Sequence, residues 1–127
     1  MAFFAVFTTG LPSVSIPLNA YSVNFGDSIK IPCTISANPS VTNVFWERIS
    51  QNGVPSSISL VPSKYSGGNV ITPDLTIANT DTTDQGFYRC LATNSVGTST
   101  SDSTFLTVVG SEFDMVGEIR KEQFLTT

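Results

Sequence analysis

Two cysteines, Cys33 and Cys90, place the strongest limits on what this chain can fold into. They stand 57 positions apart, which excludes the closely spaced Cys-x-x-Cys pair of redox and metal sites. The chain contains no histidine, so cysteine and histidine together cannot supply the four ligands of a structural zinc site. In a chain rich in Ser and Thr we therefore expect one long-range disulfide and an oxidising compartment. Two buried free thiols in a reducing compartment are the alternative.

The composition argues against several classes of function. The chain has 127 residues, which suits one domain with a single core. Its formal net charge is −4 with only six lysines and arginines, whereas nucleic-acid binding needs a basic surface. The lack of histidine removes the commonest general base, and the chain has neither a G-x-S-x-G nucleophile turn nor a phosphate-binding glycine loop. We therefore expect no enzymatic activity, no nucleic-acid partner, no cofactor and no bound metal.

The clearest strands show alternating apolar and polar residues. In segment 29–36, isoleucine and cysteine alternate with other residues, and this period of two predicts a strand with one buried face. Pro32 lies inside the pattern, and because proline has no N–H, its nitrogen should face an unpaired side or a bulge. Val44–Ile49 and Phe87–Thr93 alternate in the same way. Seven or eight such strands, separated by turn signals, predict an all-β sandwich.

Weaker patterns predict further strands. Serines alternate with apolar residues at 13–16 until Pro17, which indicates an edge strand, and Ala20–Asn24 is predicted to continue that edge. The pair Asn52-Gly53 indicates a tight turn. After this turn, Ile58–Val61 is predicted to form a short strand.

The chain divides into three regions. Residues 1–11 are apolar at their start, and we expect a leader, such as a signal-peptide remnant, or the start of a fragment. Residues 12–109 hold the predicted domain. Residues 110–127 change in character, and we expect a linker, a tag or a truncated neighbour there. A membrane-spanning helix takes about 20 apolar residues, so we expect no membrane insertion within this chain.

The motifs together resemble one protein family. The string Asp84-x-Gly86-x-Tyr88-x-Cys90 follows the strand 75–77 and precedes the segment 92–97, Ala-Thr-Asn-Ser-Val-Gly. With Cys33 and Trp46 upstream, this arrangement resembles the immunoglobulin superfamily, and its I-set type most closely. The resemblance covers about residues 12–109. It implies an immunoglobulin-like Greek-key β-sandwich of two antiparallel sheets with one inter-sheet disulfide.

The resemblance also assigns structural roles. It implies that Cys33 and Cys90 bridge the two sheets, that Trp46 packs on the bridge, and that the Tyr88 hydroxyl bonds back to the backbone in a tyrosine corner. Gly86 suits a close approach in that corner.

Two positions near the corner depart from the family pattern. Relatives often supply an arginine for Asp84, and here Lys64 is the candidate partner. Thr80 stands where relatives have an apolar residue, so we expect a slightly looser lower core. Asp81 and Asp84 have the ligand type of a calcium site, but a solvated corner is the favoured interpretation.

One sheet face is the first candidate for function. If Tyr88 and Cys90 point inward, alternate residues of that strand and of the neighbouring strand point outward. An apolar patch on a soluble sheet often marks a partner site, although ordinary cross-strand pairing is the alternative. The predicted protein-binding face consists of Phe45, Glu47, Ile49, Phe87, Arg89 and Leu91. The loops 37–42 and 94–97, which should lie at one end of the domain, are the second candidate.

The expected function is protein binding. We expect an extracellular module, secreted or part of the ectodomain of a membrane protein, that acts in cell adhesion, matrix or immune recognition. Its partner would be another protein or a second copy, and the module would be one unit of a larger protein. The alternative is an intracellular structural I-set module of a muscle-type filament protein, in which the two cysteines would stay reduced.

Overall fold

A computed structural model describes residues 8–110. Residues 1–7 and 111–127 lie outside the described residues, and with them most of the predicted leader or fragment start at 1–11 and of the predicted linker, tag or neighbour at 110–127. Within residues 8–110 the chain forms eleven short strands and one 3-10 helix. These elements are β1 (Ser13–Ser15), β2 (Ala20–Asn24), β3 (Ile29–Ile31), β4 (Thr34–Ser36), β5 (Asn43–Ile49), β6 (Pro55–Ser57), β7 (Tyr65–Gly67), β8 (Leu75–Ile77), η1 (Thr82–Asp84), β9 (Gly86–Thr93), β10 (Thr98–Thr100) and β11 (Thr104–Val109).

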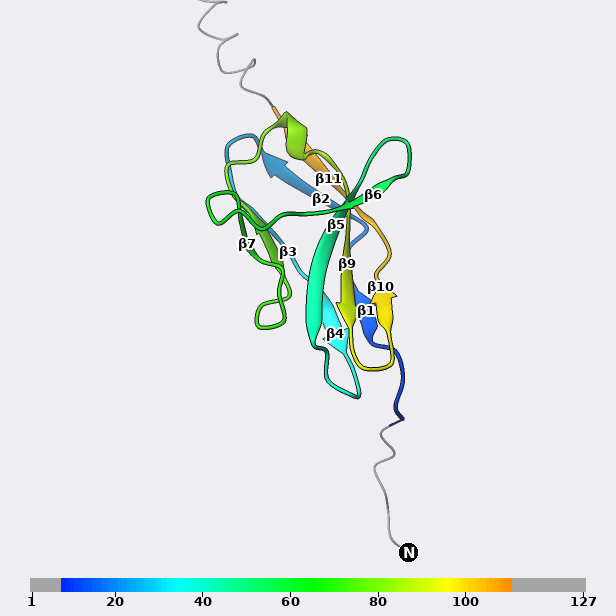
Figure 1. Cartoon of the computed structure of the whole chain (residues 1–127). Helices are drawn as coiled ribbons and strands as arrows, with labels where there is room; N and C mark the ends of the chain where they lie inside the picture. The colour runs from blue at the N-terminus through cyan, green and yellow to red at the C-terminus, as the bar shows by residue number, and fades with distance from the viewer. Residues whose placement is uncertain (1–7, 111–127) are drawn as a thin grey trace, which may run out of the picture.

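The larger sheet contains six strands. Its order is β2-β11-β9-β5-β6, and β10 also pairs with β9. The most extensive pairing joins β5 to β9, from Asn43 opposite Thr93 to Ile49 opposite Phe87, and these two strands run side by side through the centre of the domain (Figure 1). One pair departs from the expected antiparallel arrangement, because β2 runs parallel to β11.

The opposite layer is interrupted at Pro32. Strand β3 pairs with β8 in the order β3-β8-β7, whereas β4 pairs with β1. Pro32 separates β3 from β4 because it offers no N–H to a ladder. The next N–H, of Cys33, donates to the side-chain oxygen Oδ1 of Asp74 at 2.9 Å instead of to a strand. The prediction that Pro32 would face an unpaired position is confirmed.

Three strand predictions need correction. Segment 20–24 does not continue the first edge, because the chain crosses after Pro17 to the other sheet and pairs there with β11. Ile58–Val61 is not a strand; the hairpin strand β6 lies earlier, where the Asn52-Gly53 turn folds it back on β5. Strand β7 lies in a polar segment whose pattern predicts no strand. The number of strands exceeds seven or eight because long strands are split, as at Pro32.

The core lies between the two layers, around the predicted disulfide. Cys33 and Cys90 are bonded, with their Cα atoms 6.3 Å apart, and both are buried. Trp46 is 1% exposed, and its indole Nε1 donates to the carbonyl oxygen of Pro73 at 2.8 Å. Burying a side chain of this size is worth several kcal/mol, about 3–5 by truncation to alanine. Ile31, Leu75, Ile77 and Leu106 are also fully buried.

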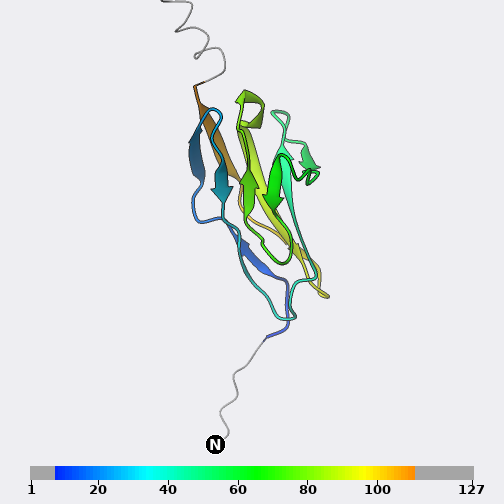
Figure 2. The ribbon, with the colours of Figure 1, turned by 90° about the vertical axis from the view of Figure 1, so that its left-hand side faces the viewer.

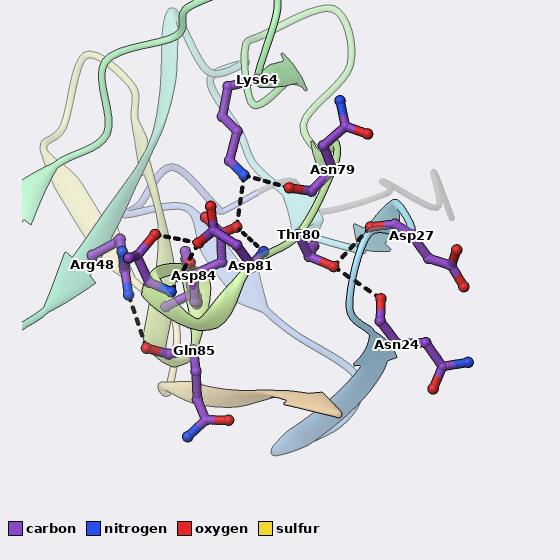
Figure 3. A network of polar contacts seen from close by, with 11 residues as sticks. Asn24, Asp27, Arg48, Lys64, Asn79, Thr80, Asp81, Asp84 and Gln85 are labelled. Carbon is purple, nitrogen blue, oxygen red and sulfur yellow. Dashed lines mark hydrogen bonds and ion pairs between the residues drawn. The ribbon is translucent and has the colours of Figure 1, made fainter. Parts of the chain in front are cut away.

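The corner between β8 and β9 is fixed by polar contacts (Figure 3). The Nζ atom of Lys64 lies 2.6 Å from Oδ2 of Asp84 and donates to the carbonyl oxygen of Asn79 at 3.1 Å. The same Asp84 oxygen accepts from the backbone N–H of Asp81 at 2.8 Å, which closes a capping box at η1. The Asp84 side chain is 3% exposed, so the Lys64 charge offsets much of the cost of burying it. Lys64 is therefore the basic partner that the sequence proposes.

Two further residues complete this corner. The hydroxyl of Tyr88 is buried and donates to the backbone carbonyl of Asp84, as the tyrosine corner requires. Burial raises the pKa of Tyr88 well above its ordinary value of 10.0. The Thr83 hydroxyl donates to the carboxylate of Asp81 and lowers the pKa of that group. The corner thus favours a neutral phenol and a charged aspartate.

Thr80 fills its position by hydrogen bonding instead of apolar packing. Its side chain is 1% exposed, and its hydroxyl lies 3.1 Å from the carbonyl oxygen of Asn24 and 2.8 Å from that of Asp27 (Figure 3). A buried hydroxyl without a partner would cost about 1–3 kcal/mol, and these contacts remove that cost. Thr80, which was expected to loosen the lower core, is therefore hydrogen-bonded to the turn between β2 and β3.

Candidate protein-binding face

The predicted face is assembled by the register of β5 and β9. Phe45 lies opposite Leu91, Glu47 opposite Arg89, and Ile49 opposite Phe87. Alternate residues of both strands, such as Val44, Trp46, Tyr88 and Cys90, are buried in the core. Because successive side chains of a strand point to opposite sides, the six predicted residues lie on the outer side of the larger sheet.

The end of this face that lies beside β10, where Phe45 pairs with Leu91, is not an exposed apolar patch. Leu91 is only 7% exposed, although it lies outside the main core cluster. It has a neighbour on each side, Phe45 on β5 and Thr100 on β10, and Phe45 itself is only half-buried. The prediction that Leu91 offers an apolar surface to a partner is therefore wrong, because β10 adds a strand beside it.

The two charged residues of the face bind each other. Oε1 of Glu47 accepts from Nε of Arg89 at 2.7 Å and lies 2.7 Å from its Nη2. Their side chains are 15% and 28% exposed, so the pair is partly shielded from solvent screening. Each of these two residues of the predicted face therefore already has a charged partner within the sheet.

The exposed apolar surface lies at the opposite end of the face, around Phe87, where β9 begins and β5 ends. This side chain is 46% exposed. Its ring packs edge-to-face on that of Phe105, with centroids 4.8 Å apart and planes at 73°. On the other side Phe87 has Ile49 as its cross-strand neighbour. Phe105 is not among the six predicted residues of the face, although its alternation with buried Leu106 places it on the outer side.

A hollow of about 520 Å³ opens beside these apolar residues. Ile49, Phe87 and Phe105 line it together with polar residues from the β5–β6 turn and from the start of β9. Arg48 also lines it, and its Nη2 donates to the carbonyl oxygen of Gln85 at 3.0 Å (Figure 3). The guanidinium carbon of Arg48 lies 5.0 Å from the centre of the Tyr88 ring, a distance typical of a cation–π contact.

The second candidate, the loop end of the domain, is organised by Asn94. This residue is 4% exposed. Its Nδ2 donates to the carbonyl oxygens of Gly10 and Pro39, at 2.8 and 3.0 Å, and its Oδ1 accepts from the N–H groups of Val96 and Gly97. The predicted proximity of the two loops is confirmed, and Gly10 is bound between them through Asn38 and Asn94. Asn94 has a structural role there, because all its hydrogen-bonding capacity is used.

The described residues contain neither a metal-binding cluster nor a membrane-spanning helix. Among residues 8–110, no group of three or more acidic or cysteine side chains is arranged to hold a metal ion. The carboxylates of Asp81 and Asp84 instead accept hydrogen bonds around η1. In the same residues, no helix is long and apolar enough to cross a membrane.

The match to a family model decides what kind of domain this is. The model of the immunoglobulin domain covers residues 12–94, which include both cysteines, Trp46 and the tyrosine corner. The chain belongs to the immunoglobulin domain family. Its bonded cysteines, buried tryptophan and corner tyrosine hold the immunoglobulin domain together.

The immunoglobulin domain has relatives in long proteins. A peroxidasin homologue of Caenorhabditis elegans (pxn-1) is 34% identical over 77% of this chain, and the muscle M-line assembly protein unc-89 of the same organism is 32% identical over 91%. The basement membrane-specific heparan sulfate proteoglycan core protein of Mus musculus is 30% identical over 87%. This chain spans 8%, 1% and 3% of those proteins, respectively.

A solved structure has the same fold. The N-terminal Ig1-2 module of the Drosophila receptor protein tyrosine phosphatase DLAR superposes with a TM-score of 0.63 at 28% identity. The match covers 84% of this chain and 50% of that one. The immunoglobulin domain described here thus corresponds to about half of a tandem module.

Proposed function

We propose that this chain is an extracellular, protein-binding immunoglobulin domain of the I-set type. It would act in cell adhesion, matrix or immune recognition as one unit of a larger protein. The observation that carries the proposal is the apolar surface that exposed Phe87 forms with half-buried Ile49 and Phe105 beside the hollow. Apolar side chains gathered on the open side of a soluble sheet favour contact with another protein.

The arrangement of the two ends supports a role in a longer chain. The described residues begin at one end of the elongated domain, and β11 leaves at the other (Figure 2). Units with this arrangement can follow one another in a row while their sheet faces remain accessible. The small share of each relative that this chain spans agrees with such a role.

The disulfide favours the extracellular location. A Cys33–Cys90 bond persists in oxidising compartments and is rare in the cytosol, and one relative is by name a basement membrane protein. The second candidate is an intracellular structural module of a muscle-type filament protein, favoured by the similarity to an M-line assembly protein. In that location the cysteines would be reduced. Labelling intact, unpermeabilised cells of the source with an antibody separates the two, because an intracellular module is stained only after permeabilisation.

We also propose that the domain is not an enzyme. The chain has no histidine, and the polar groups of the corner between β8 and β9, such as Lys64 and Asp84, bind each other. An activity would need a nucleophile and a general base directed into a pocket. The one hydroxyl among the lining residues of the hollow beside Phe87 belongs to Ser50 and accepts from the backbone N–H of Val54, and no carboxylate or histidine lines the hollow with it.

The binding role is tested by two variants that replace apolar side chains of similar fractional exposure. Phe87 is 46% exposed on the sheet, and Val96 is 48% exposed at the loop end, so Phe87→Ser and Val96→Ser remove similar apolar areas. Fluorescently labelled full-length chain is applied to tissue sections of the source. We expect specific staining that Phe87→Ser reduces at least tenfold and Val96→Ser leaves unchanged. Equal staining by both variants would contradict a binding role for this face.

A further inference from the structure

Ile71 is the most exposed large apolar side chain among the described residues. It is 93% exposed, and it lies in the loop between β7 and β8 beside Val70, which is itself 41% exposed. The described domain therefore leaves this side chain uncovered. Burying a side chain of this type strengthens an association by roughly tenfold or more, and this gain is open to a contact with another molecule.

The loop that carries Ile71 is ordered by its own hydrogen bonds. Oδ1 of Asn69 accepts from the N–H groups of Ile71 and Thr72, at 3.0 and 2.9 Å, and the Asn69 N–H donates to the carbonyl oxygen of Thr72 at 3.1 Å. Gly67 and Gly68 begin the turn with φ values of 72° and 68°, which glycine adopts most readily. A side chain presented by such a loop loses little entropy on binding, and the N–H groups beside it need no replacement for water.

The hollow beside Phe87 is an apolar site for such a side chain on the same domain. Its volume is about 520 Å³, which is ample for a branched aliphatic group. Phe87 and Phe105 fix each other by edge-to-face packing, and Ile49 lines the hollow with them, so the apolar wall is already ordered. No acidic residue lines the hollow, and the loop 68–72 contains no charged residue. The contact thus brings no like charges together, although the formal net charge of the chain is −4.

The loop and the hollow lie too far apart to meet within one molecule. The loop joins two strands of the sheet β3-β8-β7, whereas residues of β5, β9 and β11 in the larger sheet line the hollow. The loop after β7 lies well apart from the β5–β6 turn, from which Gln51 and Gly53 line the hollow (Figure 1). A contact between the two surfaces therefore needs a second copy of the chain. Because the two surfaces differ, that contact joins the copies head to tail.

We propose that Ile71 of one copy inserts into the hollow beside Phe87 of a second copy. The inference rests on the proposed binding function of this face and names another copy of the same chain as its partner. Each terminal copy of such an assembly keeps either a free loop or a free hollow. The assembly therefore grows beyond a dimer as the concentration rises.

Sedimentation velocity of the full-length chain over a wide concentration range tests this contact. Ile71→Ser removes the inserting side chain, and Phe87→Ser removes part of the wall of the hollow; both side chains are exposed, so neither variant loses a core residue. Leu18→Ser is the control, because Leu18 is 57% exposed and lines a different hollow. Native folding of each variant is verified by the fluorescence of buried Trp46.

We expect the wild type and Leu18→Ser to associate with the same concentration dependence. Ile71→Ser and Phe87→Ser should each weaken the association at least tenfold. An equal mixture of these two variants is the sharpest test, because Ile71→Ser keeps the hollow and Phe87→Ser keeps the loop. The mixture should form a complex of two chains and nothing larger, since one intact loop and one intact hollow meet in each pair.

The outcomes separate this inference from the binding function of the face. Association that Phe87→Ser weakens and Ile71→Ser leaves unchanged would overturn the inference and leave the binding function intact. A wild type that stays monomeric throughout, or a mixture that does not associate, would also overturn the inference, and the tissue staining then decides the binding function by itself. Association that is insensitive to Phe87→Ser would overturn the inference and count against the face as a binding surface.

Discussion

Replacing Lys64 by methionine should destabilise the domain through the charge that it leaves behind. The variant keeps most of the apolar stem but removes the ammonium group 2.6 Å from Asp84. The Asp84 carboxylate, whose side chain is 3% exposed, is then stabilised in the corner by the hydrogen bond from the backbone N–H of Asp81 alone. Breaking a buried ion pair costs about 3–5 kcal/mol, and the 27% exposure of the Lys64 side chain lets water compensate in part. We expect a loss of about 2–3 kcal/mol in the free energy of unfolding.

The chain offers a matched control and a double-mutant cycle. Lys30 lies 3.5 Å from Asp74 with its side chain 62% exposed, so Lys30→Met should cost less than about 1 kcal/mol. Asp84→Asn keeps a side-chain oxygen that accepts from the Asp81 N–H, and it leaves the Lys64 ammonium without a carboxylate but within reach of water. It should therefore lower the free energy of unfolding less than Lys64→Met does. The double variant Lys64→Met/Asp84→Asn should recover much of the loss, with a coupling energy of about 1–3 kcal/mol.

Urea unfolding of the full-length chain measures these values. Trp46 is the only tryptophan, and its 1% exposure makes its fluorescence a direct report of core disruption. The midpoint should shift without a change in slope, because the surface exposed on unfolding stays the same. If Lys64→Met cost no more than Lys30→Met, the claim that Lys64 neutralises a buried carboxylate would be refuted.

Two further predictions concern Asn94 and Tyr88. Asn94→Ala removes four hydrogen bonds from a buried position and should cost about 2–4 kcal/mol, whereas Asn52→Ala on the exposed turn should stay within about 0.5 kcal/mol, both by urea unfolding. Burial raises the pKa of Tyr88 above 10.0, so the tyrosine of the unfolded chain ionises at a lower pH than that of the folded domain. The contribution of the neutral phenol to the free energy of unfolding is therefore complete below pH 10 and is lost as the pH rises further. Stability should therefore decline above about pH 10, and less steeply in Tyr88→Phe; equal slopes for both proteins would contradict this assignment.

The sequence predicted those parts of the fold that depend on local spacing. The string from Asp84 to Cys90 identified the corner and its strand, and Pro32 identified an unpaired position in segment 29–36, although not that the strand divides there into β3 and β4. Lys64 could be proposed because no arginine stood at the family position. These predictions succeeded because each depends on one property of one side chain or backbone group: the hydroxyl of Tyr88, the missing N–H of Pro32 and the positive charge of Lys64.

The candidate site was predicted less well, because it depends on register between distant strands. Alternation places Leu91 on the outer side but does not show that β10 adds a strand beside it. Phe105 is far from Phe87 in sequence, and its position opposite that residue follows from the pairing of β11 with β9. Likewise, the Glu47–Arg89 pair requires knowledge that these residues lie directly opposite each other.

The central claim, an extracellular immunoglobulin domain, depends most directly on the state of its two cysteines in the organism. Protein isolated from its native source, alkylated at once and digested without reduction, should yield one peptide pair linked through Cys33 and Cys90. That result would agree with the bonded pair in the core and with an oxidising compartment. Two fully alkylated thiols in the native protein would contradict the account and favour the intracellular filament module.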